Sequence, residues 1–251
     1  MSLTKFRAIA ASSFALLLLP ASARLAMAQE VATRYSSMAP IAQYLMADQA
    51  AEIALARSAA PEPISRRAEI LVLGRHGYTT AVRGSNGFVC IVGRGWSYAA
   101  DPDFWNPKVR VPICVNAPAA RTYLVRIRKI ADLALAGRSL DQVNAAMAAA
   151  LARKQLAPMA PGAMAYMMSR QGYGGDVVPH LRSHLMFFFS DADPAMWGAN
   201  LPGAPVSAVA DPVEHVTEFF IATPRWSDGT ENRSGPAAPA GGTAAPRHEH
   251  P

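Results

Sequence analysis

The sequence has no apolar run long enough to cross a bilayer as a helix. The longest, from Ala8 to Leu19, holds about a dozen residues, whereas a spanning helix needs roughly 20. Cysteine is scarce too, because the 251 residues include two. There is also no Gly-x-Ser-x-Gly elbow, no phosphate loop and no dinucleotide fingerprint. These absences predict no stable membrane span after signal cleavage and argue against the commonest periplasmic hydrolases.

The first residues instead have the pattern of a secretory signal peptide. Lys5 and Arg7 precede the apolar run, and small residues with the A-x-A spacing of a cleavage site end at Ala28. Cleavage there makes Gln29 the mature N-terminus. Residues 21–23 are a poorer cleavage site, and an uncleaved anchor is the other alternative. We therefore expect residues 1–28 to be removed and the protein to be periplasmic or extracellular.

The charge of the chain gives no support to nucleic-acid binding. The formal net charge is +6, and loss of Lys5, Arg7 and Arg24 with the signal leaves +3, because residues 1–28 contain no acid. A basic run at 121–129 is of a kind that solvated helical faces routinely carry. We predict no nucleic-acid partner. The partner, a small molecule or a protein, and any cofactor stay unknown.

Both cysteines, Cys90 and Cys114, lie in the part that would be exported. In an oxidising compartment an isolated pair is most simply a disulfide. It would close a loop of about 25 residues and stabilise the fold by roughly 3 kcal/mol. The alternative is a catalytic thiol, which needs a base beside a free cysteine, and nothing in the sequence places one there.

The rest of the chain predicts one α+β domain over residues 29–226. We expect a small antiparallel sheet, about three to four helices and one long loop held by the disulfide. Residues 40–59 predict a helix. Apolar runs at 68–73, 78–82 and 88–92 predict an antiparallel meander, because short turns separate them.

The middle of the chain predicts a loop followed by helices. Residues 93–118 are interrupted by several prolines and predict a long irregular loop tied to the third strand by the disulfide. Helical character returns at Ala119 and breaks at Gly137. Ser139 and Gln142 then form a capping-box pattern at the start of an amphipathic helix.

The last third predicts strands and a tail. Residues 185–189 and 217–221 predict buried strands, and residues 163–169 fit either a short helix or a strand. Residues 227–251 consist mainly of proline, alanine, glycine and polar side chains, so they predict a disordered tail.

His180 and His184 have the spacing with which two histidines on one helix face bind zinc. Pro179 precedes them and a phenylalanine-rich run follows, so we expect His184 to open a strand. The two side chains would then lie roughly 13 Å apart. The glutamate of a His-Glu-x-x-His site is also missing. We predict no metal ligands here.

The segment 166–200 is the best candidate for a ligand site. Its glycines let the backbone approach a ligand, and its aromatic and polar side chains are of the kind that line small-molecule pockets. A plain surface loop with aromatic residues over the core is the alternative. The predicted ligand-binding residues are Tyr166, Ser169, Arg170, Tyr173, Asp176, His180, His184, Trp197 and Asn200.

Four phrases occur together: Asn86-Gly-Phe88-Val-Cys90, Asp103-Phe-Trp-Asn-Pro107, Pro161-Gly-Ala-Met-Ala-Tyr-Met-Met168 and Trp197-Gly-Ala-Asn-Leu-Pro202. In these the chain resembles an uncharacterised family of exported bacterial proteins, over about residues 46 to 228. The resemblance implies no activity, ligand or catalytic residue. The family tends to be richer in histidine and tryptophan where this chain has residues 177–182. That departure argues against a histidine-based site.

Two functions therefore stay open. The first is a noncatalytic domain that binds a small molecule or a partner through residues 166–200. The second is a hydrolase-like enzyme that uses Asp176, His180 or His184, with or without a metal. An enzyme needs a base within hydrogen-bond reach of an acid or nucleophile in a cleft. Because no nucleophile presents itself, binding is the preferred hypothesis.

Overall fold

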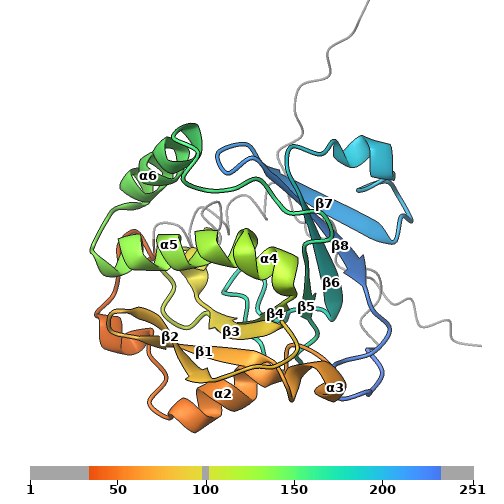
Figure 1. Cartoon of the computed structure of the whole chain (residues 1–251), viewed down its shortest axis with the longest axis horizontal. Helices are drawn as coiled ribbons and strands as arrows, with labels where there is room; N and C mark the ends of the chain where they lie inside the picture. The colour runs from red at the N-terminus through yellow and green to blue at the C-terminus, as the bar shows by residue number, and fades with distance from the viewer. Residues whose placement is uncertain (1–33, 98–101, 233–251) are drawn as a thin grey trace, which may run out of the picture.

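The computed structural model of the chain describes residues 34–97 and 102–232 (Figure 1). They form an α+β domain built on one eight-stranded, mostly antiparallel sheet. This confirms the predicted fold class, with a larger sheet than expected. The predicted signal peptide, its cleavage site and residues 233–251 lie outside the described residues. Within the described ranges, no helix is long and apolar enough to cross a membrane.

The sheet has the strand order β2-β1-β3-β4-β5-β6-β8-β7. The strands are β1 (Glu69–Gly74), β2 (Gly77–Val82), β3 (Val89–Gly93), β4 (Val111–Val115), β5 (Met164–Met167), β6 (His184–Phe189), β7 (Val206–Asp211) and β8 (Val216–Ala222). Neighbours pair antiparallel except β1 and β3, which are parallel.

Helices cover both faces of the sheet (Figure 1). The helices are η1 (Ile41–Gln43), α2 (Gln49–Arg57), α3 (Glu62–Ser65), η2 (Gly95–Ser97), α4 (Ala117–Arg121), α5 (Tyr123–Leu135), α6 (Leu140–Ala152) and η3 (Pro194–Trp197). On one face α2 contacts β1, β3 and β4, and on the other α4 and α5 lie over the sheet. The larger apolar core lies under α5, where Leu124, Ile127 and Ile130 are buried. Those three positions recur at the spacing of one helix face.

The predicted meander of the first three strands is wrong in its order. Strand β3 does not pair with β2 but crosses to the other side of β1, where Ile70 is the partner of Cys90. The connection passes directly under the start of β1. A Cβ atom on Gly84 would lie 2.2 Å from the backbone nitrogen of Glu69, so only glycine fits this close passage. The crossing therefore places both cysteine strands in the middle of the sheet.

The disulfide between Cys90 and Cys114 is confirmed. The two cysteines are register partners on the antiparallel strands β3 and β4. The predicted irregular loop at 93–118 therefore ends in a strand, which Pro112 hid from sequence analysis. The bond lies under α2, within a second apolar cluster that includes Ala56 and Ile70.

Other local predictions agree with the structure to different degrees. The capping box of Ser139 and Gln142 is present at the start of α6. The predicted helix over 40–59 is instead η1 followed by α2, because Asp48 caps α2 through the N–H of Ala50. The strands predicted at 185–189 and 217–221 are β6 and β8, and 163–169 contains the strand β5.

Residues 227–232, which composition assigned to the tail, form a turn bonded to the domain. The N–H of Ser227 donates to the carbonyl of Met168, and that of Trp226 to the carbonyl of Thr230, both at 2.9 Å. Backbone hydrogen bonds to neighbouring elements can order a segment that has little apolar surface of its own. Strand β7 was not predicted either, because it consists mainly of small residues.

Candidate functional site

The predicted ligand residues do not surround one pocket. Tyr173 and Asp176 come together, since the Tyr173 hydroxyl donates to Oδ1 of Asp176. That carboxylate also accepts from the Tyr35 hydroxyl at 2.9 Å and from Arg34 at 3.0 Å. The hydroxyl of Tyr173 is the main reason why the pKa of Asp176 is lowered. Desolvation, followed by the bond to Asp176, raises the pKa of Tyr173 to about 12.

Asn200 has a structural role at the edge of the sheet. Its side-chain amide donates to the carbonyl of Ala208 at 2.9 Å and accepts from the N–H of Ala208 at 3.0 Å. Its own N–H donates to the carbonyl of Val206 at 3.1 Å. Asn200 adopts φ 64°, a left-handed conformation that asparagine tolerates better than most residues. Its polar atoms are therefore engaged by β7 rather than directed to a ligand.

Trp197 packs on the sheet next to this edge. Its ring lies 4.7 Å from that of Phe219 and 5.0 Å from that of Phe189, measured between centroids. Half of the side chain stays exposed. The contacts place Trp197 as a cover over the aromatic side chains of β6 and β8.

His184 opens β6, as predicted, and faces phenylalanine rather than an acid. Its Nδ1 lies 2.7 Å from the carbonyl of Arg182, and its ring packs against Phe220. Burial lowers its pKa. His180 is exposed. Within the described residues no hydrogen bond or ion pair joins the two histidines to Asp176, and no group of three or more His, Cys, Asp or Glu is placed to hold a metal ion.

The remaining predicted residues lie near β5. Tyr166 packs against Phe88, with ring centroids 6.1 Å apart. Ser169 shares a 2.6 Å hydrogen bond with Ser58, the C-cap residue of α2, and is buried. Arg170 is exposed and donates to the hydroxyl of Thr230 at 3.2 Å. These contacts connect β5 to α2 and to the turn at 225–232.

A groove of about 400 Å³ lies elsewhere, between the segment that precedes η1, the loop after η2 and the α5–α6 turn. This volume falls in the range of about 300–1,000 Å³ that is common for small-molecule sites. The groove is lined by Tyr35, Ser36, Ser37, Met38, Pro102, Phe104, Trp105, Gly137, Arg138, Ser139, Leu140 and Asp141. None of these residues belongs to the predicted segment 166–200, but the hydroxyl of Tyr35 donates to Asp176 and so connects the groove to that segment.

The aromatic floor of the groove is held in place by packing. Phe104 and Trp105 meet edge to face with ring centroids 4.6 Å apart, and both are buried over most of their surface. The Tyr44 hydroxyl donates to the carbonyl of Trp105 at 2.8 Å. Because these rings are fixed by the core, the floor is formed before any ligand arrives.

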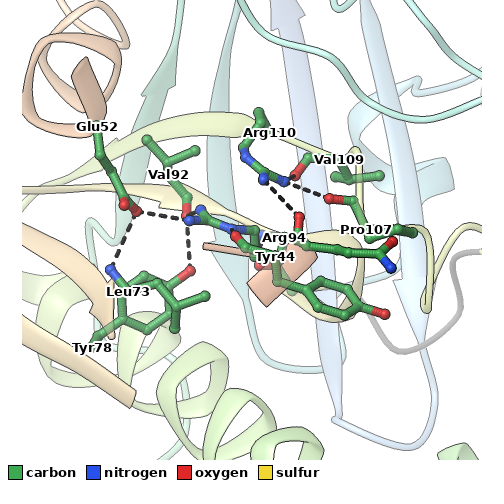
Figure 2. A network of polar contacts seen from close by, with 11 residues as sticks. Tyr44, Glu52, Leu73, Tyr78, Val92, Arg94, Pro107, Val109 and Arg110 are labelled. Carbon is green, nitrogen blue, oxygen red and sulfur yellow. Dashed lines mark hydrogen bonds and ion pairs between the residues drawn. The ribbon is translucent and has the colours of Figure 1, made fainter. Parts of the chain in front are cut away.

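A buried charge network lies behind this floor (Figure 2). The guanidinium of Arg94 donates to the carboxylate of Glu52 at 2.9 Å and to the carbonyl of Tyr44 at 2.7 Å. Glu52 also accepts from the N–H of Leu73 at 3.2 Å. The Tyr78 hydroxyl donates to the carbonyl of Val92, and the guanidinium of Arg94 bonds the same carbonyl. Burial raises the pKa of Tyr78 to about 12. The network joins α2, β1 and β3 to Tyr44, whose hydroxyl bonds the carbonyl of Trp105.

Arg110 fastens the other end of the loop (Figure 2). Its guanidinium donates to the carbonyls of Pro107 and Val109 at 2.8 and 2.7 Å, and to the carbonyl of Gln43 at 3.2 Å. Desolvation, and then the charge of Arg94, lowers the pKa of Arg110 to about 10. The loop that carries the aromatic floor is therefore tied both to η1 and to itself.

The rim of the groove is polar. Arg138 and Asp141 are exposed, and their opposite charges lie at the α5–α6 turn. Ser139 is the N-cap of α6, and its hydroxyl accepts from the N–H of Gln142 at 3.3 Å. Ser36 and Ser37, which precede η1, also line the groove and are exposed. A ligand with an apolar body and a few polar groups fits such a combination of floor and rim.

Sequence analysis did not identify this groove. It assigned Gly137 to a helix break and Ser139 to the start of the next helix, and it placed Phe104 and Trp105 in a long loop. The signal that was present is a pair of adjacent aromatic residues in a proline-rich segment, which indicates a loop packed on a core. Comparisons with protein-family models, with curated proteins and with solved structures found no match to this chain.

Proposed function

We propose that this chain is an exported bacterial protein, periplasmic or secreted, whose α+β domain binds a small molecule in the groove without catalysing a reaction. The groove with its fixed aromatic floor is the observation that carries this proposal. Export is supported by the signal-peptide pattern and by the disulfide, which is typical of oxidising compartments.

The lining of the groove indicates the chemistry of the ligand. Met38 and Leu140, which are partly exposed, offer an apolar surface over the largely buried rings of Phe104 and Trp105, and an aromatic or alicyclic body would pack on it. Exposed serine hydroxyls and the charge of Arg138 offer hydrogen bonds at the rim. A flat ring with one acidic or hydroxyl substituent combines both requirements.

The enzyme alternative gains less support from the site. Asp176 already accepts hydrogen bonds from Tyr173, Tyr35 and Arg34, and its pKa is lowered. A carboxylate with a lowered pKa is a poor general base near neutral pH. His184 is bonded through Nδ1 to a backbone carbonyl. A binding function does not require Asp176 or His184 to accept or donate a proton.

The proposal is tested by screening a library of small aromatic acids and alcohols with ligand-observed NMR against the exported chain and a Ser37→Trp variant. Ser37 is exposed on the groove wall, so a tryptophan there fills the groove without disturbing the core. We expect hits whose signals disappear in the variant. Ser85→Trp, at an exposed serine in the β2–β3 connection, is the matched control. Hits that survive Ser37→Trp, or no hits at all, would overturn the proposal.

A further inference from the structure

A second, much smaller cavity lies between α5 and the β7–β8 hairpin. Its volume of about 10 Å³ is room for about one water molecule. Tyr123 and Arg126 of α5 line it, together with Asp211, Glu214 and Glu218 of the hairpin. These five side chains belong to residues that are at most 9% exposed. Ser97 of η2 and the apolar side chains of Ile127, Ile130 and Val216 complete the lining. The cavity is thus a small enclosed space between packed elements rather than a site open to a substrate.

The contacts satisfy these groups unevenly. Tyr123 donates its hydroxyl to Oε1 of Glu218 at 2.7 Å. Arg126 lies 3.8 Å from Oε2 of Glu214, and its guanidinium also donates to the carbonyls of Glu214 and Ala157. The Nε of Arg126 is buried, and within the described chain it has no hydrogen-bond partner. Glu218 therefore faces a neutral phenol, while the guanidinium is directed mainly at Glu214.

Acids outnumber bases around the cavity. Three carboxyl groups, those of Asp211, Glu214 and Glu218, line it together with one guanidinium among the described residues, that of Arg126. Asp211 also accepts from the N–H groups of Val213 and Glu214, which follow it in the turn. With all three carboxyls ionised, the buried group would carry an excess of negative charge. Uncompensated buried charge is strongly unfavourable, so the packed state favours a proton on one carboxyl.

The elements around the cavity do not neutralise the excess negative charge of its carboxyl groups. The neighbouring turn contributes Asp191, which pairs with His215 at 2.9 Å on the exposed surface. Desolvation, and then the charge of Asp211, raises the pKa of Glu214 to about 7, although Arg126 opposes this. Desolvation likewise raises the pKa of Glu218 to about 7, against the hydrogen bond from its tyrosine.

We propose that this cavity is a proton-controlled latch, in which the β7–β8 hairpin docks on α5 with Glu218 protonated and loosens when that proton is lost. The proton reduces the excess negative charge and lets the carboxyl donate a hydrogen bond as well as accept the one from Tyr123. This regulatory role does not depend on the groove, because the two cavities share no lining residue.

The direction of the pH effect follows from the raised pKa. A carboxyl that holds its proton more tightly in the folded state contributes stability that is complete below its unfolded pKa of about 4.3. That contribution is lost as the pH rises through about 7, the folded value for Glu218. His184, whose pKa is lowered by burial, has the opposite effect below about 6.5. The contribution of Glu218 to stability is therefore measured as the difference between the wild type and a variant that lacks this carboxyl.

The test compares the exported chain with its Glu218→Gln variant by urea unfolding between pH 4.5 and 8. Glutamine keeps the shape and hydrogen bonds of a protonated carboxyl at every pH. We expect the ratio of unfolded to folded wild-type protein, relative to the variant, to rise up to about tenfold per pH unit between about 5 and 7. Hydrogen exchange should quicken in β7 and β8 over the same range, and not in β1. Glu62→Gln, at an exposed glutamate of α3, is the control and should leave the pH dependence unchanged.

Two outcomes would overturn the latch. One is a parallel pH dependence of wild type and Glu218→Gln, which would mean that Glu218 carries no proton near neutral pH. The other concerns the wild type alone, and it applies even if the variant does not fold. Carbon NMR of the glutamate carboxyl groups should show at least one of them titrating near pH 7, and titration of all of them near the ordinary value of about 4.3 would contradict the proposal.

Discussion

Two buried arginines in this domain, Arg94 and Arg126, differ in the number of carboxyl groups that surround them. Arg94 faces one carboxylate, that of Glu52, and its other donors bond backbone carbonyls (Figure 2). Arg126 shares its cavity with three carboxyls and keeps one N–H without a hydrogen bond in the described chain. The first site pairs one cation with one carboxylate, and the guanidinium has hydrogen-bond partners on three sides. The second has more carboxyls than cations and lowers its net charge by holding a proton, so its state depends on pH.

The largest expected effect comes from breaking the satisfied pair. Arg94→Met should lower the free energy of unfolding by about 3–5 kcal/mol, because it leaves the carboxylate of Glu52 buried without its cation. Urea unfolding at pH 7 measures this loss. Arg66→Met, which removes an exposed pair with Glu62, is the control and should change stability little. A loss below about 1 kcal/mol for Arg94→Met would mean that this network is not a fixed part of the fold.

Removing the disulfide should have the next largest effect. Replacing both Cys90 and Cys114 with alanine should cost about 3 kcal/mol, because the unfolded chain regains the freedom of a loop of about 25 residues. The two cysteines belong to the apolar cluster under α2 and do not line the acidic cavity. We therefore expect stability to fall at every pH while its decline between pH 5 and 7 persists. Disappearance of that decline in the double variant would contradict the separation of the two regions.

A smaller effect should follow from Tyr123→Phe. Loss of the hydroxyl that donates to Glu218 should cost about 1 kcal/mol at pH 5.5. That hydroxyl lowers the pKa of Glu218, so its removal should raise the pKa further and move the midpoint of the stability decline to higher pH. Unfolding curves over pH 5–8.5 measure both changes. Tyr166→Phe, on β5, serves as the control, and an unchanged midpoint in Tyr123→Phe would mean that the tyrosine does not act on this carboxyl.

Local features of the fold were predictable from sequence, and long-range ones were not. The strand at 185–189, the capping box at Ser139 and the disulfide rest on neighbouring residues or on a single pair, and the structure contains all three. The parallel pairing of β1 with β3 depends on a crossing at Gly84, where the reason is close backbone packing. Periodicity carries no information about such a crossing.

The candidate site shows the same limit more strongly. Asp176 and Tyr173 were both predicted as ligand-binding residues, and the structure brings them together because they lie three residues apart. The groove combines Tyr35, Trp105 and Arg138, which come from three distant segments of the chain. The acidic cavity joins α5 to a hairpin nearly a hundred residues later, at a separation of 95 residues for Tyr123 and Glu218. Both sites depend on how the helices lie on the sheet, which the sequence pattern alone does not fix.

The edge of the sheet at β7 has a consequence for how copies of the protein meet. Edge strands present unpaired backbone groups, and another molecule can add a strand to them. Here Asn200 occupies the N–H and the carbonyl of Ala208 and the carbonyl of Val206, as a neighbouring strand would. Asn200 thus occupies backbone groups of β7 that a strand from a second copy would otherwise bond. Copies of the protein that come together would meet an edge whose backbone groups at Val206 and Ala208 are already bonded, which limits self-association through this part of the strand.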